Sequence, residues 1–479
     1  MMQKKMSRRD FLNLAAVTTA GSALAACAPA AAPSASNAGE TGDAAGMEDV
    51  TINVWGPTGL LIDNIYAQFT EQTGISVNNS DIGDAVFGDQ KYLTATAAGT
   101  GPDSAFQNRH TFAQFAAKGL YQDVTERMTV DGLAVTDFTP VQIEETSWEG
   151  KVYGLPLRTD VRYLYWNKDF YADAGLDPDS PPTTWTELEA YAEATNVFDA
   201  DGKHERYGFV PYLYGNSWTW LYGFLNKAPS LSEDKRTVLA DDERWVEALD
   251  WMVNFYDNYV GDFELANAFR DATQSAGLGQ PFVAGRTAMT AHGNWFVGDL
   301  LRSPGVNWEA APMPIPDGGE KSTWSCGWSY VLSPDAVHAD QGWEFMSWII
   351  GVEGWKAEAN ATIEDVQRTW EREQLEGEPQ YWPRLACYLP ALQMLEEEYV
   401  TQLPEREQNT WALTRDALEN WTHGCGSEMG VAALEYWVEM DNSTRAALSH
   451  AMSAKEAMLQ CKELVQEATD RAWEAIDAA

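Results

Sequence analysis

The sequence is poor in long apolar runs and in basic residues. Apart from a moderately apolar stretch that ends at Leu24, no run approaches the roughly 18 residues of a membrane span. It has 32 Lys and Arg against 72 Asp and Glu, a formal net charge of −40 over 479 residues. A surface this acidic repels nucleic acid and anionic lipid, so we expect no nucleic-acid partner, and solubility is the simplest reason for the charge.

Motifs that mark common enzymes and metal sites are also missing. The sequence has no G-x-S-x-G, no H-E-x-x-H and no phosphate loop, and Glu320-Lys321-Ser322 lacks the required Gly-Lys. It has no C-x-x-C, and His423-Gly424-Cys425 has no further ligands at zinc spacing. We therefore predict no catalytic residues, no metal and no cofactor.

Cysteine is scarce, with five in the chain. Four lie beyond position 27, namely Cys326, Cys387, Cys425 and Cys461, and three disulfide pairings remain open. Cys461 falls on the apolar stripe of an expected helix, where a buried free thiol is common.

The N-terminus resembles an export and anchoring signal. Residues 7–12, Ser-Arg-Arg-Asp-Phe-Leu, resemble the twin-arginine motif, and residues 24–27, Leu-Ala-Ala-Cys, resemble a lipobox. These features predict a signal peptide at 1–26 and lipidation of Cys27. Residues 27–47 are rich in Ala, Pro, Ser and Gly and predict a disordered tether.

Strand and helix patterns alternate from residue 50 onward. Residues 50–55 alternate apolar and polar side chains, a helical pattern ends at Gly74, and 75–77 open a second strand. This order predicts a βαβ unit and a parallel sheet. Capping boxes at Thr184 and Ser453 predict helix starts, 287–291 predict a buried strand, and the acidic chain beyond Trp343 is almost wholly helical in pattern. The fold class is α/β with a helical C-terminal part.

Several segments, in order, resemble the family 1 extracellular solute-binding proteins, which are the receptors of ATP-driven importers. The matching segments are Gly99–Asp103, Gly119–Thr125, Gly150–Pro156, Tyr163–Lys168, Ala174–Leu176, Pro182–Leu188 and Phe282–Met289. Trp166 replaces a Tyr that is usual in this family. Residues 356–450 match least well.

The resemblance implies a two-lobed periplasmic-binding-protein-like (type II) fold with a ligand cleft between the lobes. It assigns 48–158 plus 325–355 to lobe 1 and 159–324 plus 356–479 to lobe 2. Crossings are expected near 158–162, near 323–327 and within about 352–380. It also implies a monomer in the periplasm or on the outer face of the cytoplasmic membrane that passes its solute to an ABC transporter permease.

Aromatic residues are abundant, with 21 Trp in the chain, and several lie beside polar residues where strands are expected to end. Ligands in open α/β sheets bind beyond the carboxyl ends of strands. Flat rings cover the C–H face of a sugar, while amides, carboxylates and guanidinium groups read its hydroxyls. The predicted ligand-binding residues are Trp55, Asn108, Arg109, Asp160, Arg162, Tyr212, Trp218, Trp220, Asn294, Trp295, Trp324 and Trp328.

The expected ligand is therefore a sugar, an oligosaccharide or a glycoside. In sugar-binding relatives, a Trp at the position of Trp295 stacks on the ligand, and a pair like Asp160 and Arg162 meets hydroxyls. Two alternatives remain open. The same fold could bind a polyamine, a peptide or a metal complex, or the chain could be a secreted carbohydrate-active enzyme, because sequence cannot place two carboxylates across a cleft.

Overall fold

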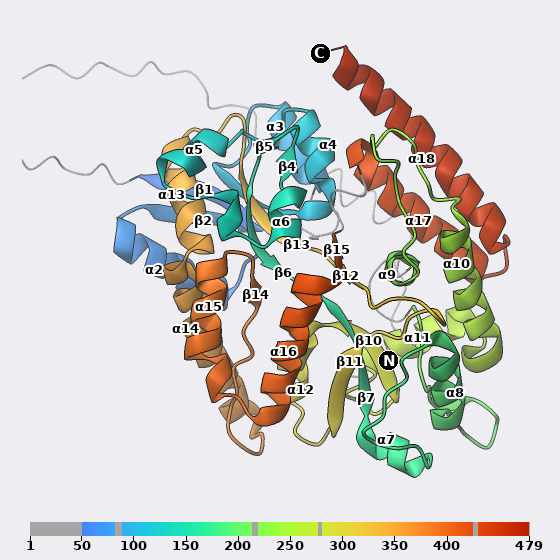
Figure 1. Cartoon of the computed structure of the whole chain (residues 1–479). Helices are drawn as coiled ribbons and strands as arrows, with labels where there is room; N and C mark the ends of the chain where they lie inside the picture. The colour runs from blue at the N-terminus through green and yellow to red at the C-terminus, as the bar shows by residue number, and fades with distance from the viewer. Residues whose placement is uncertain (1–49, 82–88, 213–218, 276–279, 425–429, 479) are drawn as a thin grey trace, which may run out of the picture. The chain divides into compact units, whose positions relative to one another are not determined.

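Residues 50–81, 89–212, 219–275, 280–424 and 430–478 are described by a computed structural model of the chain. A six-stranded mixed sheet forms one part of it, in the order β14-β6-β13-β3-β1-β2 (Figure 1). Its strands are β1 (Thr51–Gly56), β2 (Ser76–Asp81), β3 (Ser104–Asn108), β6 (Leu155–Thr159), β13 (Gly327–Leu332) and β14 (Leu385–Ala386). Both β2 and β3 run parallel to β1, which confirms the predicted βαβ unit.

Helix α2 (Leu60–Thr73) connects β1 to β2 and ends as its sequence predicts. Gly74 adopts a left-handed conformation with φ of 77°, and its N–H donates to the Thr70 carbonyl. A glycine takes this conformation without the steric cost that a Cβ would add. Helices α13 (Ala339–Ile350) and α14 (Val352–Glu373) join α2 around the core of this sheet, which includes the fully buried Val54, Phe69 and Phe345.

A three-stranded antiparallel sheet, in the order β10-β7-β11, forms the centre of a second part. Its strands are β7 (Arg162–Asn167), β10 (Met289–Gly293) and β11 (Trp308–Pro312). The core beside it includes α8 (Trp185–Thr195), α9 (Thr219–Leu225) and α10 (Glu243–Phe255). Thr184 and Glu187 form the predicted capping box at the start of α8.

The chain passes between the two sheets at two of the predicted places. Strand β6 ends at Thr159 and β7 begins at Arg162. Strand β12 (Thr323–Ser325) pairs in parallel with β15 (Thr422–Gly424), and β13 begins at Gly327. Both crossings are therefore extended backbone with only one or two residues between strands.

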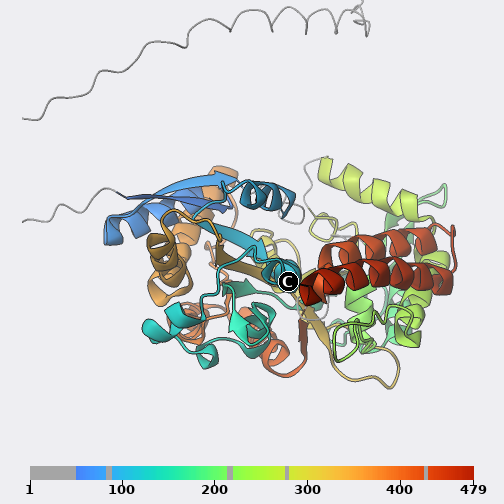
Figure 2. The same cartoon turned by 90° about the horizontal axis from the view of Figure 1, so that it is seen from above.

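The C-terminal part is helical, as predicted. Its helices are α14, α15 (Leu389–Glu398), α16 (Glu405–Asn420), α17 (Ala433–Leu448) and α18 (Ala454–Asp477). Helices α17 and α18 pack against each other and against α10 (Figure 2), and α17 also contacts the turn that follows β3.

The third crossing lies later than the expected interval within about 352–380. Helix α14 packs against α2, and β14 pairs with β6, so the chain still contributes to the six-stranded sheet at Ala386. Helix α16 packs against β11 of the other sheet. Residues 356–386, which we expected in lobe 2, thus contact the six-stranded sheet, while Ala359 and Tyr381 also pack in one cluster with Trp308 of the other sheet. An amphipathic pattern shows which face of a helix is apolar, but it does not show which sheet the helix packs on.

The remaining helices are short or peripheral to the cleft described below. They are α3 (Asp89–Ala97), α4 (Phe112–Ala117), α5 (Thr125–Val130), α6 (Pro140–Glu145), α7 (Lys168–Asp173), α11 (Phe263–Ser275) and α12 (Val297–Leu301). Two hairpins, β4 (Ser147–Trp148) with β5 (Lys151–Val152) and β8 (Val197–Phe198) with β9 (His204–Arg206), complete the strands.

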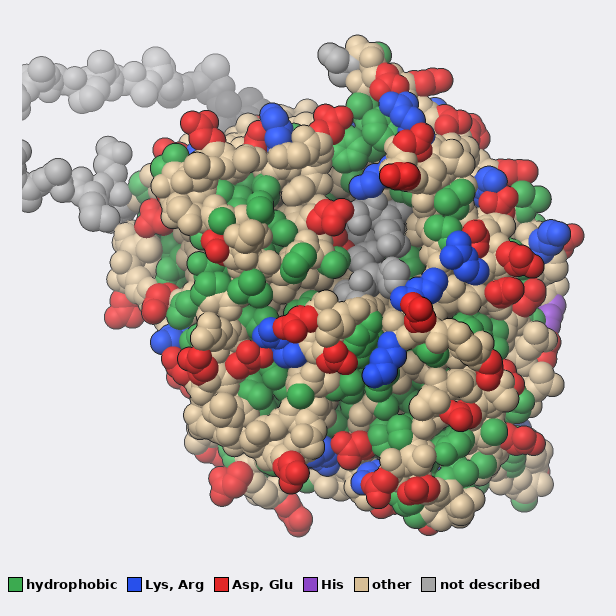
Figure 3. All heavy atoms as spheres, viewed as in Figure 1, with side chains coloured by type: hydrophobic (Ala, Val, Ile, Leu, Met, Phe, Trp, Pro, Cys, Tyr) green, Lys and Arg blue, Asp and Glu red, His purple; other side chains and the backbone are tan. Residues whose placement is uncertain are grey.

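Acidic side chains lie on the surface of the molecule (Figure 3), and the free cysteines are buried. Figure 3 shows acidic side chains spread over one face of the molecule instead of gathered in one patch. Among the residues described, no helix has both the length and the apolar character to cross a bilayer. Cys461 is a buried free thiol, as predicted, and so is Cys387, whereas Cys326 is disulfide-bonded. Cys425 lies outside the described residues.

Candidate functional site

A cavity of about 230 Å³ lies where the chain crosses between the two sheets. The ends of β6, β13 and β14 form one side of it, and the short helix η4 (Asn294–Phe296), which follows β10, forms the other. Its lining residues are Arg158, Thr159, Asp160, Asn294, Trp295, Gly327, Trp328, Arg384 and Leu385. The structure thus brings together four predicted residues that are far apart in sequence, Asp160, Asn294, Trp295 and Trp328.

Trp295 presents the most exposed aromatic ring of this cavity. Its relative exposure is 41%, whereas Trp328, the other aromatic residue of the lining, is half-buried. A Cβ at Gly293 would lie 1.9 Å from the Trp295 ring, so the absence of a side chain at Gly293 allows the indole to pack across the backbone.

Arg162 lies between Trp295 and Trp324 and packs its guanidinium against both rings. Its guanidinium carbon is 4.8 Å from the ring centroid of Trp295 and 4.8 Å from that of Trp324, which are cation–π distances. Asp160 forms an ion pair with Arg162 and also accepts a hydrogen bond of 2.9 Å from the Cys326 N–H. The pair Asp160–Arg162 therefore orients the Trp295 ring, while Asp160 itself lines the cavity.

Trp328 provides a second aromatic surface. Its ring stacks on Phe106 with centroids 4.7 Å apart and planes within 6°, so its orientation is fixed by the core of the six-stranded sheet. Asn294 is held on the opposite side, where its Oδ1 accepts a hydrogen bond from the Val161 N–H at 3.3 Å. The cavity thus has aromatic rings, a carboxylate and an amide attached to two different sheets.

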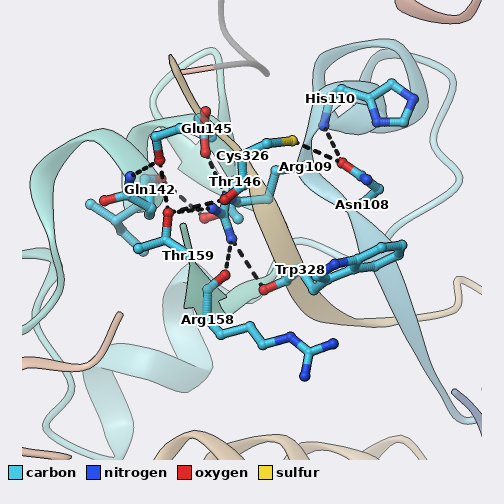
Figure 4. A network of polar contacts seen from close by, with 12 residues as sticks. Asn108, Arg109, His110, Gln142, Glu145, Thr146, Arg158, Thr159, Cys326 and Trp328 are labelled. Atoms are coloured by element: carbon cyan, nitrogen blue, oxygen red, sulfur yellow. Dashed lines mark hydrogen bonds and ion pairs between the residues drawn. The ribbon is translucent and has the colours of Figure 1, made fainter. Parts of the chain in front are cut away.

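Beneath the cavity, a buried network joins the strand ends (Figure 4). Arg109 donates to Glu145 at 2.5 Å, to the carbonyls of Arg158 and Trp328 at 2.8 and 3.1 Å, and to Thr159 Oγ1 at 3.1 Å. Burial alone would lower the pKa of Arg109, but the Glu145 carboxylate holds it above the ordinary value. Both side chains are completely excluded from solvent.

This burial corrects the prediction for Arg109, which cannot touch a ligand in this conformation. Its donors are used by protein acceptors, and it acts as a positioning residue for the two crossings. Strand-end placement identified the residue but could not show which way its side chain points.

Two further predictions are wrong for the same reason. Trp220 is 0% exposed, with its ring 5.2 Å from that of Trp245 in the core around α10. Tyr212 is buried, and its hydroxyl donates to Asp441 at 2.6 Å. In both cases an aromatic residue near a polar loop is a core residue, which is the more frequent role of such residues.

The remaining predicted residues lie near the cavity or away from it. Trp324 packs behind Arg162, as described above. Asn108 caps the turn after β3 by accepting from the His110 N–H, and the Trp55 ring lies 4.2 Å from the Lys91 ammonium. Neither Asn108 nor Trp55 lines the cavity. Trp218 lies outside the described residues.

Sequence reasoning missed two arginines of the cavity wall, Arg158 and Arg384. Burial, together with repulsion from Arg384, lowers the pKa of Arg158 to about 9. Arg158 adjoins the predicted crossing and could have been included on that ground. Arg384 belongs to the segment that matches the family least, so no motif pointed to it.

Comparison with known proteins agrees with this architecture. Residues 64–363 match the family model described as bacterial extracellular solute-binding protein. A binding protein of Brucella abortus is 23% identical over 283 residues, which cover 56% of this chain and 62% of that protein. The sn-glycerol-3-phosphate-binding periplasmic protein UgpB of the same organism is 25% identical over 175 residues, 36% of this chain and 38% of that protein.

A solved structure with the same fold, CpMnBP1 with mannotriose bound, has a TM-score of 0.69 at 18% identity and covers 87% of this chain and all of that one. The chain spans less than two thirds of the length of the curated relatives above. The family model, in contrast, covers more than half of this chain. The two-lobed α/β fold and the cavity between its sheets are those expected of such a receptor, and the chain belongs to the bacterial extracellular solute-binding protein family.

Proposed function

We propose that this protein captures a sugar in the cavity at the crossings and delivers it to the permease of an ABC importer. The observation that carries the proposal is the pairing of two oriented aromatic rings, Trp295 and Trp328, with Asp160 and Asn294 in one cavity. Rings of this kind cover the C–H faces of a sugar, and the polar groups bind its hydroxyls. The mannotriose bound to the solved relative supports the same class of ligand.

Ligand contacts to both sheets would drive closure of the two lobes. A ligand shifts a conformational equilibrium only by its difference in affinity for the two states. Trp295 and Asn294 follow β10 of one sheet, whereas Trp328 and Arg158 lie on strands of the other. A sugar that touches both groups is therefore bound more tightly in the closed form. Up to residue 355, the proposed lobes have the boundaries predicted from the sequence. Beyond residue 355, we place β14 in lobe 1, because it pairs with β6, and α16 in lobe 2, because it packs on β11.

Family membership places the protein outside the cytoplasm. The finer localisation is part of the proposal: export of the folded chain by the twin-arginine route, lipid on Cys27, and a tether over 27–47 that keeps a monomeric receptor near its permease. Confinement of this kind raises the effective concentration of the receptor at the permease. Two experiments test the anchor. Globomycin should block processing of the signal peptide, and Cys27→Ser should no longer associate with the membrane.

The decisive test is binding of an oligosaccharide panel to the wild-type protein and to Trp295→Ala. Calorimetry should show a loss of about 2 kcal/mol or more in the variant, the scale of a buried aromatic anchor. Trp348→Phe is the matched control, because that indole donates to Gln72 and packs on Phe69 away from the cavity. Equal affinities in wild type and Trp295→Ala would remove Trp295 from the binding site.

A phosphorylated polyol is the second candidate, because UgpB, one of the curated relatives, is named for sn-glycerol-3-phosphate. Native mass spectrometry of gently purified protein separates the candidates. A bound non-carbohydrate mass would contradict the sugar proposal and leave the receptor function intact. Turnover of any glycan in the panel would favour the alternative of a carbohydrate-active enzyme.

A further inference from the structure

We propose that the sugar taken by this cavity carries an anionic group, a carboxylate, sulfate or phosphate, which Arg158 and Arg384 bind together. The inference rests on the proposed sugar-binding function and names the ligand class more narrowly. It follows from the charges on the cavity wall, from the partners that each charge already has, and from the acidity of the rest of the chain.

The main observation is that the guanidinium of Arg158 faces the cavity without a carboxylate partner among the described residues. Its carbonyl accepts from Arg109, but its guanidinium extends away from that network (Figure 4). Among the described residues, no carboxylate or hydrogen-bond acceptor pairs with this guanidinium. Its carbon lies 5.3 Å from the Phe106 ring centroid, so an aromatic face supports it on one side. Arg158 is half-buried, and a guanidinium partly withdrawn from water without a carboxylate partner costs free energy, which an anionic ligand would offset.

Arg384 adds a second positive charge that is only weakly compensated. Its Nε lies 3.5 Å from Glu358 Oε1, beyond an ideal charged hydrogen bond. Glu358 already accepts from the Tyr381 hydroxyl at 2.9 Å and from Thr362 at 3.1 Å. Both guanidinium groups line the same cavity, and burial followed by repulsion from Arg384 lowers the pKa of Arg158.

The acidic groups nearby are engaged elsewhere. Asp160, the one carboxylate on the cavity wall, is ion-paired with Arg162. Asp299, which also senses Arg384, pairs with Arg302 at 3.2 Å. The wall of the cavity therefore has an excess of positive charge, in a chain whose formal net charge is −40.

Guanidinium groups suit oxyanions better than they suit neutral hydroxyls. Arginine donates through a planar fork that matches carboxylate, sulfate and phosphate oxygens, and it has no acceptor for a hydroxyl proton. Both arginines also border a second cavity of about 300 Å³, lined by apolar residues such as Ile65 and by Glu358, whose carboxylate already has the partners named above. The anionic group is therefore expected at the boundary between the two cavities, with the sugar ring beside Trp295 and Trp328.

The test uses pairs of probes that differ in charge only. Calorimetry of the wild-type protein would compare trigalacturonate with galactotriose, and glucose with glucose 6-sulfate and glucose 6-phosphate. We expect at least one charged probe to bind ten-fold or more tightly than its neutral partner, and this preference to fall as NaCl is raised. The three acids distinguish carboxylate, sulfate and phosphate as the source of the charge.

Variants identify the residues responsible. Arg158→Gln and Arg384→Gln should each reduce the ratio of charged to neutral affinity at least ten-fold, and Arg158→Lys should retain part of it. Arg368→Gln, which removes a surface arginine of α14 paired with Asp365, is the matched control. Because, among the described residues, its guanidinium has no carboxylate or hydrogen-bond partner to lose and only the Phe106 ring beside it, ligand-free Arg158→Gln should melt at or near the wild-type temperature.

The outcomes separate this inference from the function it rests on. Neutral sugars that bind as tightly as their charged partners would overturn the anionic class and leave sugar binding intact. A preference that survives in both Gln variants, or a melting temperature several degrees lower in Arg158→Gln, would overturn the assignment to these arginines. Binding of no sugar of either kind would overturn the proposed function itself.

Discussion

Arg109 and Arg158 lie within one hydrogen bond of each other, yet they occupy opposite environments. Arg109 is completely buried and donates to a carboxylate, two carbonyls and a hydroxyl. Arg158 contributes its carbonyl to that network and extends its guanidinium to the cavity. The comparison shows that two neighbouring arginines have different roles. The buried network of Arg109 holds the crossings in place, whereas the cavity wall that includes Arg158 presents charges and aromatic rings to a ligand.

Removing the buried arginine should have the largest effect on stability. Arg109→Ala leaves Glu145 buried without its cation, and we expect the free energy of unfolding to fall by about 3–5 kcal/mol. Urea denaturation followed by circular dichroism measures the loss. The double variant Arg109→Met with Glu145→Leu should recover much of it, because no charge is then left buried. A loss below about 1 kcal/mol in the single variant would contradict a structural role for the pair.

Acidification should affect both regions, since each has a buried histidine. Burial lowers the pKa of His110, beside Arg109, to about 4, and burial followed by repulsion from Arg162 lowers that of His292, behind Trp295, to about 3. Unfolded histidine takes up a proton below a pH of about 6.5, whereas the folded state does not, so stability is full above that pH and falls below it. At pH 5 the loss is about 2 kcal/mol per histidine.

Urea titrations at pH 7 and pH 5 check this expectation. His110→Gln and His292→Gln should each remove about half of the difference in unfolding free energy between the two pH values. Below pH 4 the dependence due to His110 should level off first, because its folded pKa is the higher of the two. A difference that neither variant changes would assign the acid sensitivity to other groups.

The junction between the regions can be tested at Gly327, where the expected effect is smallest. This residue has φ of +150°, and a Cβ there would lie 2.3 Å from the Arg158 carbonyl oxygen and 2.8 Å from Arg109 Nη2. Gly327→Ala should therefore destabilise the protein by about 2 kcal/mol, measured by thermal unfolding. Gly298→Ala is the control, because nothing lies within 4 Å of its Cβ position and it lies in α12. Equal melting temperatures for the two variants would contradict a tight junction.

Much of the fold could be predicted from local pattern. The alternation in 50–55, the glycine at 74 and the capping box at Thr184 each depend on a short stretch of chain, and all three are confirmed. The expected strand at 287–291 is found two residues later, at Met289–Gly293, because the buried apolar run does not mark where pairing with β7 begins.

The candidate site could be predicted in part. Asp160, Asn294, Trp295 and Trp328 follow or lie on strands near the crossings, and the structure brings them to one cavity. Arg109 and Trp220 fit the same criterion but point into the interior. A residue's place at a strand end is a property of sequence, whereas the direction of its side chain depends on what packs against it.

The sequence by itself determined the family, the order of strands and helices, the acidic surface and the positions of two crossings, since each depends on local propensity or on short motifs. Only the tertiary structure decided which sheet receives the C-terminal helices, which predicted aromatics are core, and that Arg384 meets Arg158 across more than 200 residues of chain. These features depend on contacts between distant segments, and no local pattern encodes a contact with a partner that the segment meets only after folding.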